Sequence, residues 1–122
     1  MADVIRILGQ LDATTTSDTL LYTVPILKEG ALSRNAETST TCSTLCICNR
    51  TGGAVSVDVA VLPEEDGTTV ANKHYIYNGK SVAANDSIFL TIGITLGQSD
   101  KVYVKAGTAN ALSFSLFGVE TF

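Results

Sequence analysis

The stretch that decides the fold is "AVSVDVAVL", residues 54 to 62. Valine occupies every second position from 55 to 61, and the residues between the valines are Ser56, Asp58 and Ala60. A period of two is typical of a β-strand that turns one face to a core and the other to solvent. The sequence therefore predicts a strand here with its valines in the core.

The same alternation recurs along most of the chain. One side of "SIFLTIGITL", residues 87–96, carries Ile88, Leu90, Ile92, Ile94 and Leu96, and one side of "ALSFSLFG", residues 111–118, carries Leu112, Phe114 and Leu116. Shorter strands are predicted at residues 4–11, 19–24, 42–49, 73–78 and 101–106. Turn-forming residues separate them at positions 49–53, 66–67, 78–79, 85–86 and 97–100. About eight strands and no convincing helix result.

Short strands joined by tight turns indicate an all-β protein, an antiparallel two-sheet β-sandwich of either the jelly-roll or the immunoglobulin-like kind. A parallel sheet would need crossover helices, for which the sequence has no room. With 122 residues, we expect one domain, 1–122. A long loop is expected at residues 26–40, and long loops in compact domains are often functional. Its charged residues Lys28, Glu29 and Arg34 are therefore candidates for an interface.

Composition excludes several classes of function. The chain is 45% hydrophobic and 16% charged, with a net charge of −4. No apolar run is long enough for a membrane helix, and the start, "MADVIRILGQ", lacks the features of a secretion signal. Because basic residues are scattered singly, no stripe is available for phosphates. We therefore expect a soluble domain made in a cytoplasm, with neither nucleic acid nor membrane as partner.

All three cysteines lie in "TCSTLCICNR", residues 41–50. In a regular strand Cys42, Cys46 and Cys48 would share one face, and Leu45 and Ile47 would share the other. Such a strand is apolar on both sides. Either it is central and covered twice, or one face meets another subunit, so the cysteines are candidate interface residues.

The chemistry of these thiols points to packing. Neighbours two apart on a strand lie roughly 7 Å apart at the Cα atoms, which is outside disulfide geometry. Zinc would need a fourth ligand from His74, the single histidine, but C-x3-C-x-C on an extended strand splays the sulfurs apart. We expect reduced, buried cysteines and no metal or other cofactor.

Catalytic signals are weak. His74 lies in "NKHYIYN" on a predicted strand, where a partly exposed or interface histidine is a simpler interpretation than a general base. The acids of "PEEDG", residues 63–67, lack the ligand spacing of a calcium loop. No glycine-rich loop precedes a helix, so no phosphate cradle is predicted. We expect that the protein is not an enzyme.

An ordered series of segments resembles the small virion structural proteins of tailed bacteriophages, including those of cyanobacterial and marine phages. The segments are "LGQL" (8–11), "LLYTVP" (20–25), "STLCICNRT" (43–51), "YIYNGKSVAANDS" (75–87), "TIGITLGQSDKVYVKA" (91–106) and "LSFSLFGVE" (112–120). The resemblance covers nearly the whole chain, and its specificity lies in the order of the segments and in the closing residues 117–120. Residues 26–40 depart from the short connection expected after "YTVP".

The resemblance implies a capsid decoration or cement protein that is part of the virion and docks on the major capsid protein or another virion protein. Tyr75, Tyr77 and Tyr103 could face outward and are further candidate interface residues, and ordinary cross-strand packing is the alternative interpretation for each. A homo-oligomer, with a trimer favoured, would cover the exposed edges of the sheets. The competing hypothesis is a tail or fibre module that binds host-surface glycan through Tyr75, Tyr77, Asn72 and Asn78.

Overall fold

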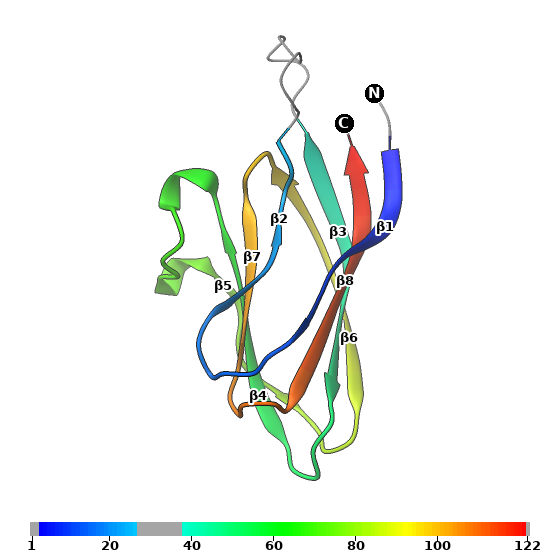
Figure 1. Cartoon of the computed structure of the whole chain (residues 1–122), viewed down its shortest axis with the longest axis vertical. Coiled ribbons are helices and arrows are strands. Elements are labelled where there is room, and N and C mark those ends of the chain that lie inside the picture. Colours follow the sequence, from blue (N-terminus) through cyan, green and yellow to red (C-terminus); the bar gives the residue numbers. More distant parts are fainter. Residues whose placement is uncertain (1–2, 27–37, 122) are drawn as a thin grey trace.

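The computed structural model describes residues 3–26 and 38–121. It contains eight strands: β1 (Asp3–Asp12), β2 (Thr19–Thr23), β3 (Ser39–Asn49), β4 (Val55–Leu62), β5 (Tyr75–Val82), β6 (Ser87–Gly97), β7 (Lys101–Ala106) and β8 (Leu112–Thr121). Sheet A has the order β1-β8-β3-β6 and sheet B the order β2-β7-β4-β5 (Figure 1). All paired neighbours are antiparallel, which confirms the predicted two-sheet sandwich.

The strand order decides between the two kinds of sandwich. β4 pairs with β5, β3 with β6, β2 with β7 and β1 with β8, so each pair encloses the previous one along the chain. This nested pairing, split over two sheets of four strands, is a jelly roll. An immunoglobulin-like domain would instead place its first strand with its second.

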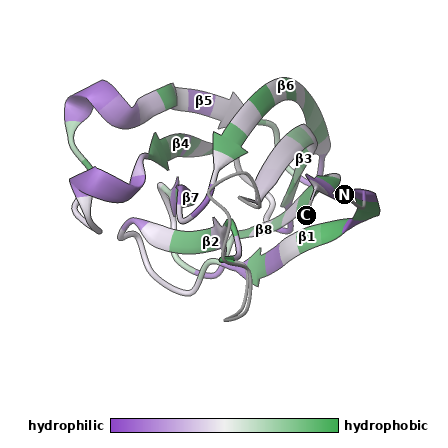
Figure 2. Ribbon diagram, turned by 90° about the horizontal axis from the view of Figure 1, so that it is seen from above, coloured by the Kyte–Doolittle hydropathy of each residue, from purple (hydrophilic) through white to green (hydrophobic). Residues whose placement is uncertain are grey.

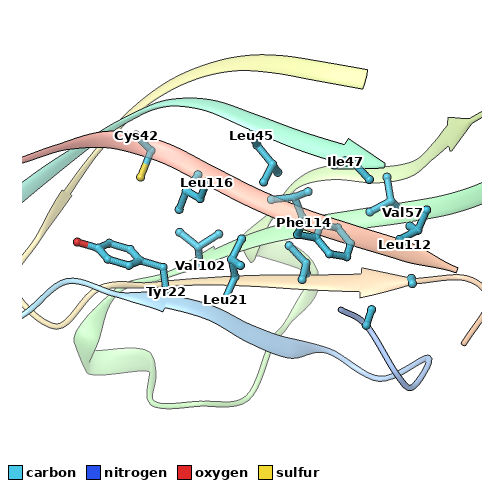
Figure 3. Packing of buried hydrophobic residues seen from close by; sticks show 14 of the residues in the cluster. Leu21, Tyr22, Cys42, Leu45, Ile47, Val57, Val102, Leu112, Phe114 and Leu116 are labelled. Carbon is cyan, nitrogen blue, oxygen red and sulfur yellow. The ribbon is translucent and has the colours of Figure 1, made fainter. Parts of the chain in front are cut away.

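The main core lies between the sheets. Sheet A contributes Leu45 and Ile47 from β3 and Phe114 and Leu116 from β8, and sheet B contributes residues such as Val102 (Figure 3). Phe114 is 1% exposed and the other four are fully buried. Burial of each such side chain stabilises the fold by about 1.5–3 kcal/mol. The alternations predicted in residues 55–61, 87–96 and 111–118 point the expected side chains to this core.

A second, smaller cluster covers part of the outer face of sheet B. Ala60, Leu62 and Tyr103 are buried there, with Val70 and Tyr75 packed against them. The connection from β4 to β5 forms this cover and contains two short 3-10 helices, Glu64–Asp66 and Asn72–His74. Sheet B is therefore partly covered on its outside by the chain itself.

The register shifts of β1 and β3 against β8 occur beside the same residue of β8. β1 has the extra residue Leu8 and β3 the extra residue Ser43, and both lie beside Phe117 of β8. Next to them, a Cβ atom on Gly118 would collide with the carbonyl oxygen of Thr41. A β-bulge adds one residue to a strand. Before the bulge, for example, even-numbered residues point to the core, and after it odd-numbered residues do.

The predicted strand at 73–78 is wrong at both ends. Lys73 and His74 belong to the second 3-10 helix, and the strand runs on to Val82. The turn predicted at residues 78–79 is a bulge inside β5, where Gly79 has φ +74° and donates its N–H to Asp58 Oδ1 at 2.6 Å. Because a positive φ suits glycine in either structure, the Asn-Gly pair does not distinguish a bulge from a turn.

Candidate functional site

The three cysteines do not share a face, contrary to the prediction. The bulge at Ser43 turns Cys42 into the core together with Leu45 and Ile47, as Figure 3 shows. Cys46 and Cys48 are half-buried on the outer face of sheet A. All three thiols are free. Burial raises the pKa of the Cys42 thiol to about 11, so Cys42 is an inert core residue and not a surface candidate.

The strand that carries them is central in its sheet, between β8 and β6. One of its faces lies in the core, and the other belongs to the outer face of sheet A. Along that face the residues aligned with Cys46 are Ser115, Gln10 and Phe89, and those aligned with Thr44 are Phe117, Ile7 and Thr91. None of these side chains is charged, which is unusual for a sheet surface.

The exposed apolar residues of this face were missed in the sequence. Ile5 is 84% exposed, Phe89 is 67% exposed and Ile7 is 49% exposed. Ile5 and Ile7 belong to β1 and Phe89 belongs to β6, which form the two edges of sheet A. For Phe89, the signal that could have found it is the absence of charge throughout "SIFLTIGITLG", residues 87–97, because a solvated strand face normally carries charges.

The three tyrosines, predicted either to face outward or to pack across strands, lie in two different clusters. A register shift between Val59 and Ala60 separates Tyr77, which packs against the main core, from Tyr75, which joins the small outer cluster. Tyr103 is in the same outer cluster and is only 7% exposed. Tyr75 and Tyr77 therefore do not form one platform, and Tyr103 is not a surface residue of the subunit.

His74 is buried and not on a strand, contrary to the prediction. Its Nδ1 accepts a hydrogen bond from the N–H of Ala71 at 2.8 Å, and its Nε2 lies 2.8 Å from Asp66 Oδ2. Lys73 Nζ lies 3.3 Å from the same carboxylate. The hydrogen bond from His74 lowers the pKa of Asp66, and Lys73 lowers it further. Since both ring nitrogens are engaged, His74 closes the 64–74 connection rather than facing a substrate.

A buried polar cluster joins the two sheets and was not anticipated. The Tyr22 hydroxyl, from sheet B, donates to Glu120 Oε2 at 2.5 Å and lies 2.8 Å from Thr40 Oγ1. Arg6 Nη1 lies 3.4 Å from Glu120 Oε1. Glu120 is 5% exposed. Burial raises the pKa of Tyr22, as do the hydrogen bond and the charge of Glu120, so the hydroxyl keeps its proton and stays a donor.

The remaining candidates, Lys28, Glu29 and Arg34, lie outside the described residues. The loop predicted at 26–40 ends earlier than expected, because β3 begins at Ser39. Within residues 3–26 and 38–121, no three His, Cys, Asp or Glu side chains are grouped to hold a metal ion. No helix in that part of the chain is long and apolar enough to cross a membrane.

Comparisons with known proteins identify a likeness of fold. No protein-family model and no curated protein sequence match the chain. The solved structure of infectious bursal disease virus, Gx strain, matches 98% of this chain at 14% identity with a TM-score of 0.51. That of the Gt strain matches 98% at 10% identity with the same TM-score. The chain spans about a third of the matched virus chains, 32% in each.

At these identities the match shows a shared fold. The virus concerned infects animals and is not a tailed bacteriophage, so the match does not extend to the family that the sequence resembles. The matched region includes nearly all of the present chain, so a fold of this kind forms one part of each matched virus chain.

Proposed function

We propose that the protein is a non-enzymatic structural component of a virion. The observation that carries the proposal is the likeness of almost the whole chain to a jelly roll in solved structures of infectious bursal disease virus. Jelly rolls recur in viral capsid proteins. An outer sheet face whose central rows carry no charge, with exposed Ile5, Ile7 and Phe89, supports an assembly role, because exposed apolar surface marks contact sites.

More specifically, we infer a capsid decoration or cement protein that docks on the outside of a shell and stabilises it. The resemblance of the ordered sequence segments to small virion structural proteins of tailed bacteriophages supports this role. Its partner would be the major capsid protein or another virion protein, met after synthesis in the host cytoplasm. We propose a trimer, since repeated weak contacts then add up through avidity.

The test uses shells of the parent virus from particles that lack this protein. Purified protein is mixed with these shells, and the amount that sediments with them is measured as the protein concentration rises. We expect saturable binding and a higher temperature of shell disruption when the protein is bound. Binding that never saturates, or that also occurs on shells of an unrelated virus, would contradict the proposal.

The glycan-binding alternative is tested on a glycan array. It would need Tyr75 and Tyr77 on one surface, and the structure places them against different clusters. Specific array binding together with failure to bind shells would favour a tail or fibre module instead.

A further inference from the structure

The exposed apolar side chains are concentrated on the two edges of sheet A. Of the seven large hydrophobic residues exposed in the described part of the chain, Val4, Ile5, Ile7 and Phe89 lie on β1 or β6. Viewed from above, these two strands bound the sheet and both carry hydrophobic bands (Figure 2). Apolar surface at both edges of one sheet indicates that something covers both.

β6 lacks three of the features that normally protect an edge strand: short length, charge and proline. It is eleven residues long and contains neither a charged residue nor proline. Its only strand partner within residues 3–26 and 38–121 is β3. Its core-facing side chains, such as Leu90 and Ile92, stay half-buried, whereas Leu45 on the neighbouring strand is fully buried. Its pairing with β3 is interrupted once, where Ile92 and Gly93 oppose Ser43, but residues 87–91 pair regularly. A long, uncharged edge is a template for another strand.

The peptide groups of β6 that face away from β3 can be identified. Asn49 N–H donates to Asp86 O at 2.8 Å, and the register pairs Cys48 with Ser87. Bonded and non-bonded pairs alternate in an antiparallel ladder, so the pair Cys46–Phe89 is a non-bonded one. The N–H and C=O of Phe89 therefore point to the free edge.

β1 is exposed in a complementary way. Residues from Asp3 to Ile7 are all exposed although they pair with β8. Ala13 N–H donates to Leu112 O at 3.1 Å, and by the same alternation the N–H of Gln10 points away from β8. β1 and β6 are ten and eleven residues long. Residues 9–12 of β1 and 87–91 of β6 lie outside the bulges of these strands, so these two segments can pair regularly with each other.

The edges of sheet B are less suited to pairing. β2 has only five residues. β5 is interrupted by register shifts and carries Lys80. Short strands, bulges and edge lysines are the usual protection of a free edge. The edge strands of sheet A are longer and are interrupted only once each, so sheet A offers the better edges for contact between copies.

We propose that β6 of one subunit pairs with β1 of a second copy of this chain, and that three subunits joined in this way form a closed ring. The number three rests on the proposed trimer. Across sheet A each strand is antiparallel to the next, so β1 and β6 run in opposite directions. A rotation about an axis along the strands keeps these directions and brings the two edges together as an antiparallel pair. A ring of this kind is formed by head-to-tail contacts.

The two symmetric alternatives fit less well. Pairing of β1 with β1 of another copy over its full length would place Asp3 opposite Asp12, and opposed like charges are destabilising. Pairing of β6 with β6 would cover Phe89 but leave Ile5 and Ile7 exposed in every copy. Head-to-tail pairing covers both edges, and the uncharged β6 opposes no charge of β1.

The experiment uses the full chain and two proline variants. Phe89→Pro and Gln10→Pro each remove an N–H that points to a free edge, so neither breaks a main-chain hydrogen bond within the subunit. Native mass spectrometry should find the unchanged protein as a trimer and each variant as a folded monomer, with circular dichroism and a cooperative melt as the check of folding. Leu20→Thr, which removes an exposed apolar residue from sheet B, is the matched control and should stay trimeric.

Mixing the two variants gives the decisive result. Phe89→Pro keeps an intact β1 and Gln10→Pro keeps an intact β6, so an equimolar mixture should form a heterodimer with one copy of each. A Gln10→Pro variant that still forms dimers would overturn the proposal in favour of β6 pairing with itself. If the protein without substitutions stays monomeric at high concentration, the pairing of β6 with β1 is also overturned. The proposed shell binding is tested separately, by the sedimentation assay.

Discussion

Removal of the Tyr22 hydroxyl tests the role of the buried polar cluster. Tyr22→Phe deletes one hydrogen bond to the Glu120 carboxylate and one contact with Thr40. A hydrogen bond to a charged group contributes about 1.5–3 kcal/mol, and the Oε2 atom of the buried carboxylate would lose the Tyr22 donor. We therefore expect the free energy of unfolding to fall by roughly 2–4 kcal/mol, a large fraction of the 5–15 kcal/mol typical of a domain.

The assay is equilibrium unfolding in urea. Protein concentration must be held fixed, because assembly of subunits adds a concentration-dependent stabilisation. The variant should shift the midpoint and leave the slope m unchanged, which separates a loss of stability from a change in the unfolded state. The melting temperature should fall by roughly 8–16 °C, at about 4 °C for each kcal/mol.

Tyr77→Phe is the matched control. Tyr77 packs against the same core, and within residues 3–26 and 38–121 its hydroxyl has no hydrogen-bond partner. Its substitution should change stability by less than about 0.5 kcal/mol. A double-mutant cycle of Tyr22→Phe with Glu120→Gln should give a coupling of roughly 1–2 kcal/mol. A change for Tyr22→Phe no larger than that of the control, or no coupling in the cycle, would refute the reasoning.

Three further outcomes are expected. Gly118→Ala should lower the melting temperature strongly, because the added Cβ atom would collide with the backbone of β3. Gly53→Ala is the control and should not lower it, since a Cβ atom there has no neighbour within 4 Å. Equal melting temperatures for the two variants would contradict the packing. The pKa of Asp66 is lowered in the folded protein, so its stabilisation is present above the unfolded pKa and is lost as pH falls through the folded pKa. Asp66→Asn should therefore flatten the fall of melting temperature as the solution is acidified through the titration of aspartate, and an unchanged slope would count against the pairing with His74. Brief maleimide labelling at neutral pH should leave Cys42 unmodified until urea is added, and labelling of Cys42 in the native protein would show that it is not buried.

The two-sheet sandwich could be predicted from the sequence because the pattern that indicates it, alternation within each strand, is local. Alternation in residues such as 55–61 reports which side chains enter the core, whatever the partner strand is. The choice between jelly roll and immunoglobulin-like order was not accessible, since it depends on which distant strands pair. That β1 lies beside β8 is a contact between the two ends of the chain, and no local pattern encodes it.

The candidate surface was harder to predict because bulges change the face of a residue without a strong sequence signal. Ser43 shifts Cys42 inward, and the irregular pairing of β5 separates Tyr75 from Tyr77. A strict period of two gives the wrong face for every residue beyond such a point. His74 was misplaced for a different reason: the 3-10 helix that carries it has only three residues, too few to show a period.

The nested pairing of the strands also bears on how the chain folds. The innermost pair, β4 with β5, closes the shortest loop, and its formation brings β3 and β6 near each other. Each further pair then closes a loop already shortened by the one inside it, which reduces the entropy that each step loses. Folding is expected to proceed from the middle of the chain outwards, with β1 and β8 joining last, at the slow rate of a protein rich in distant contacts. During synthesis, when β8 emerges last, the first strand must wait for almost the entire chain before it finds its partner.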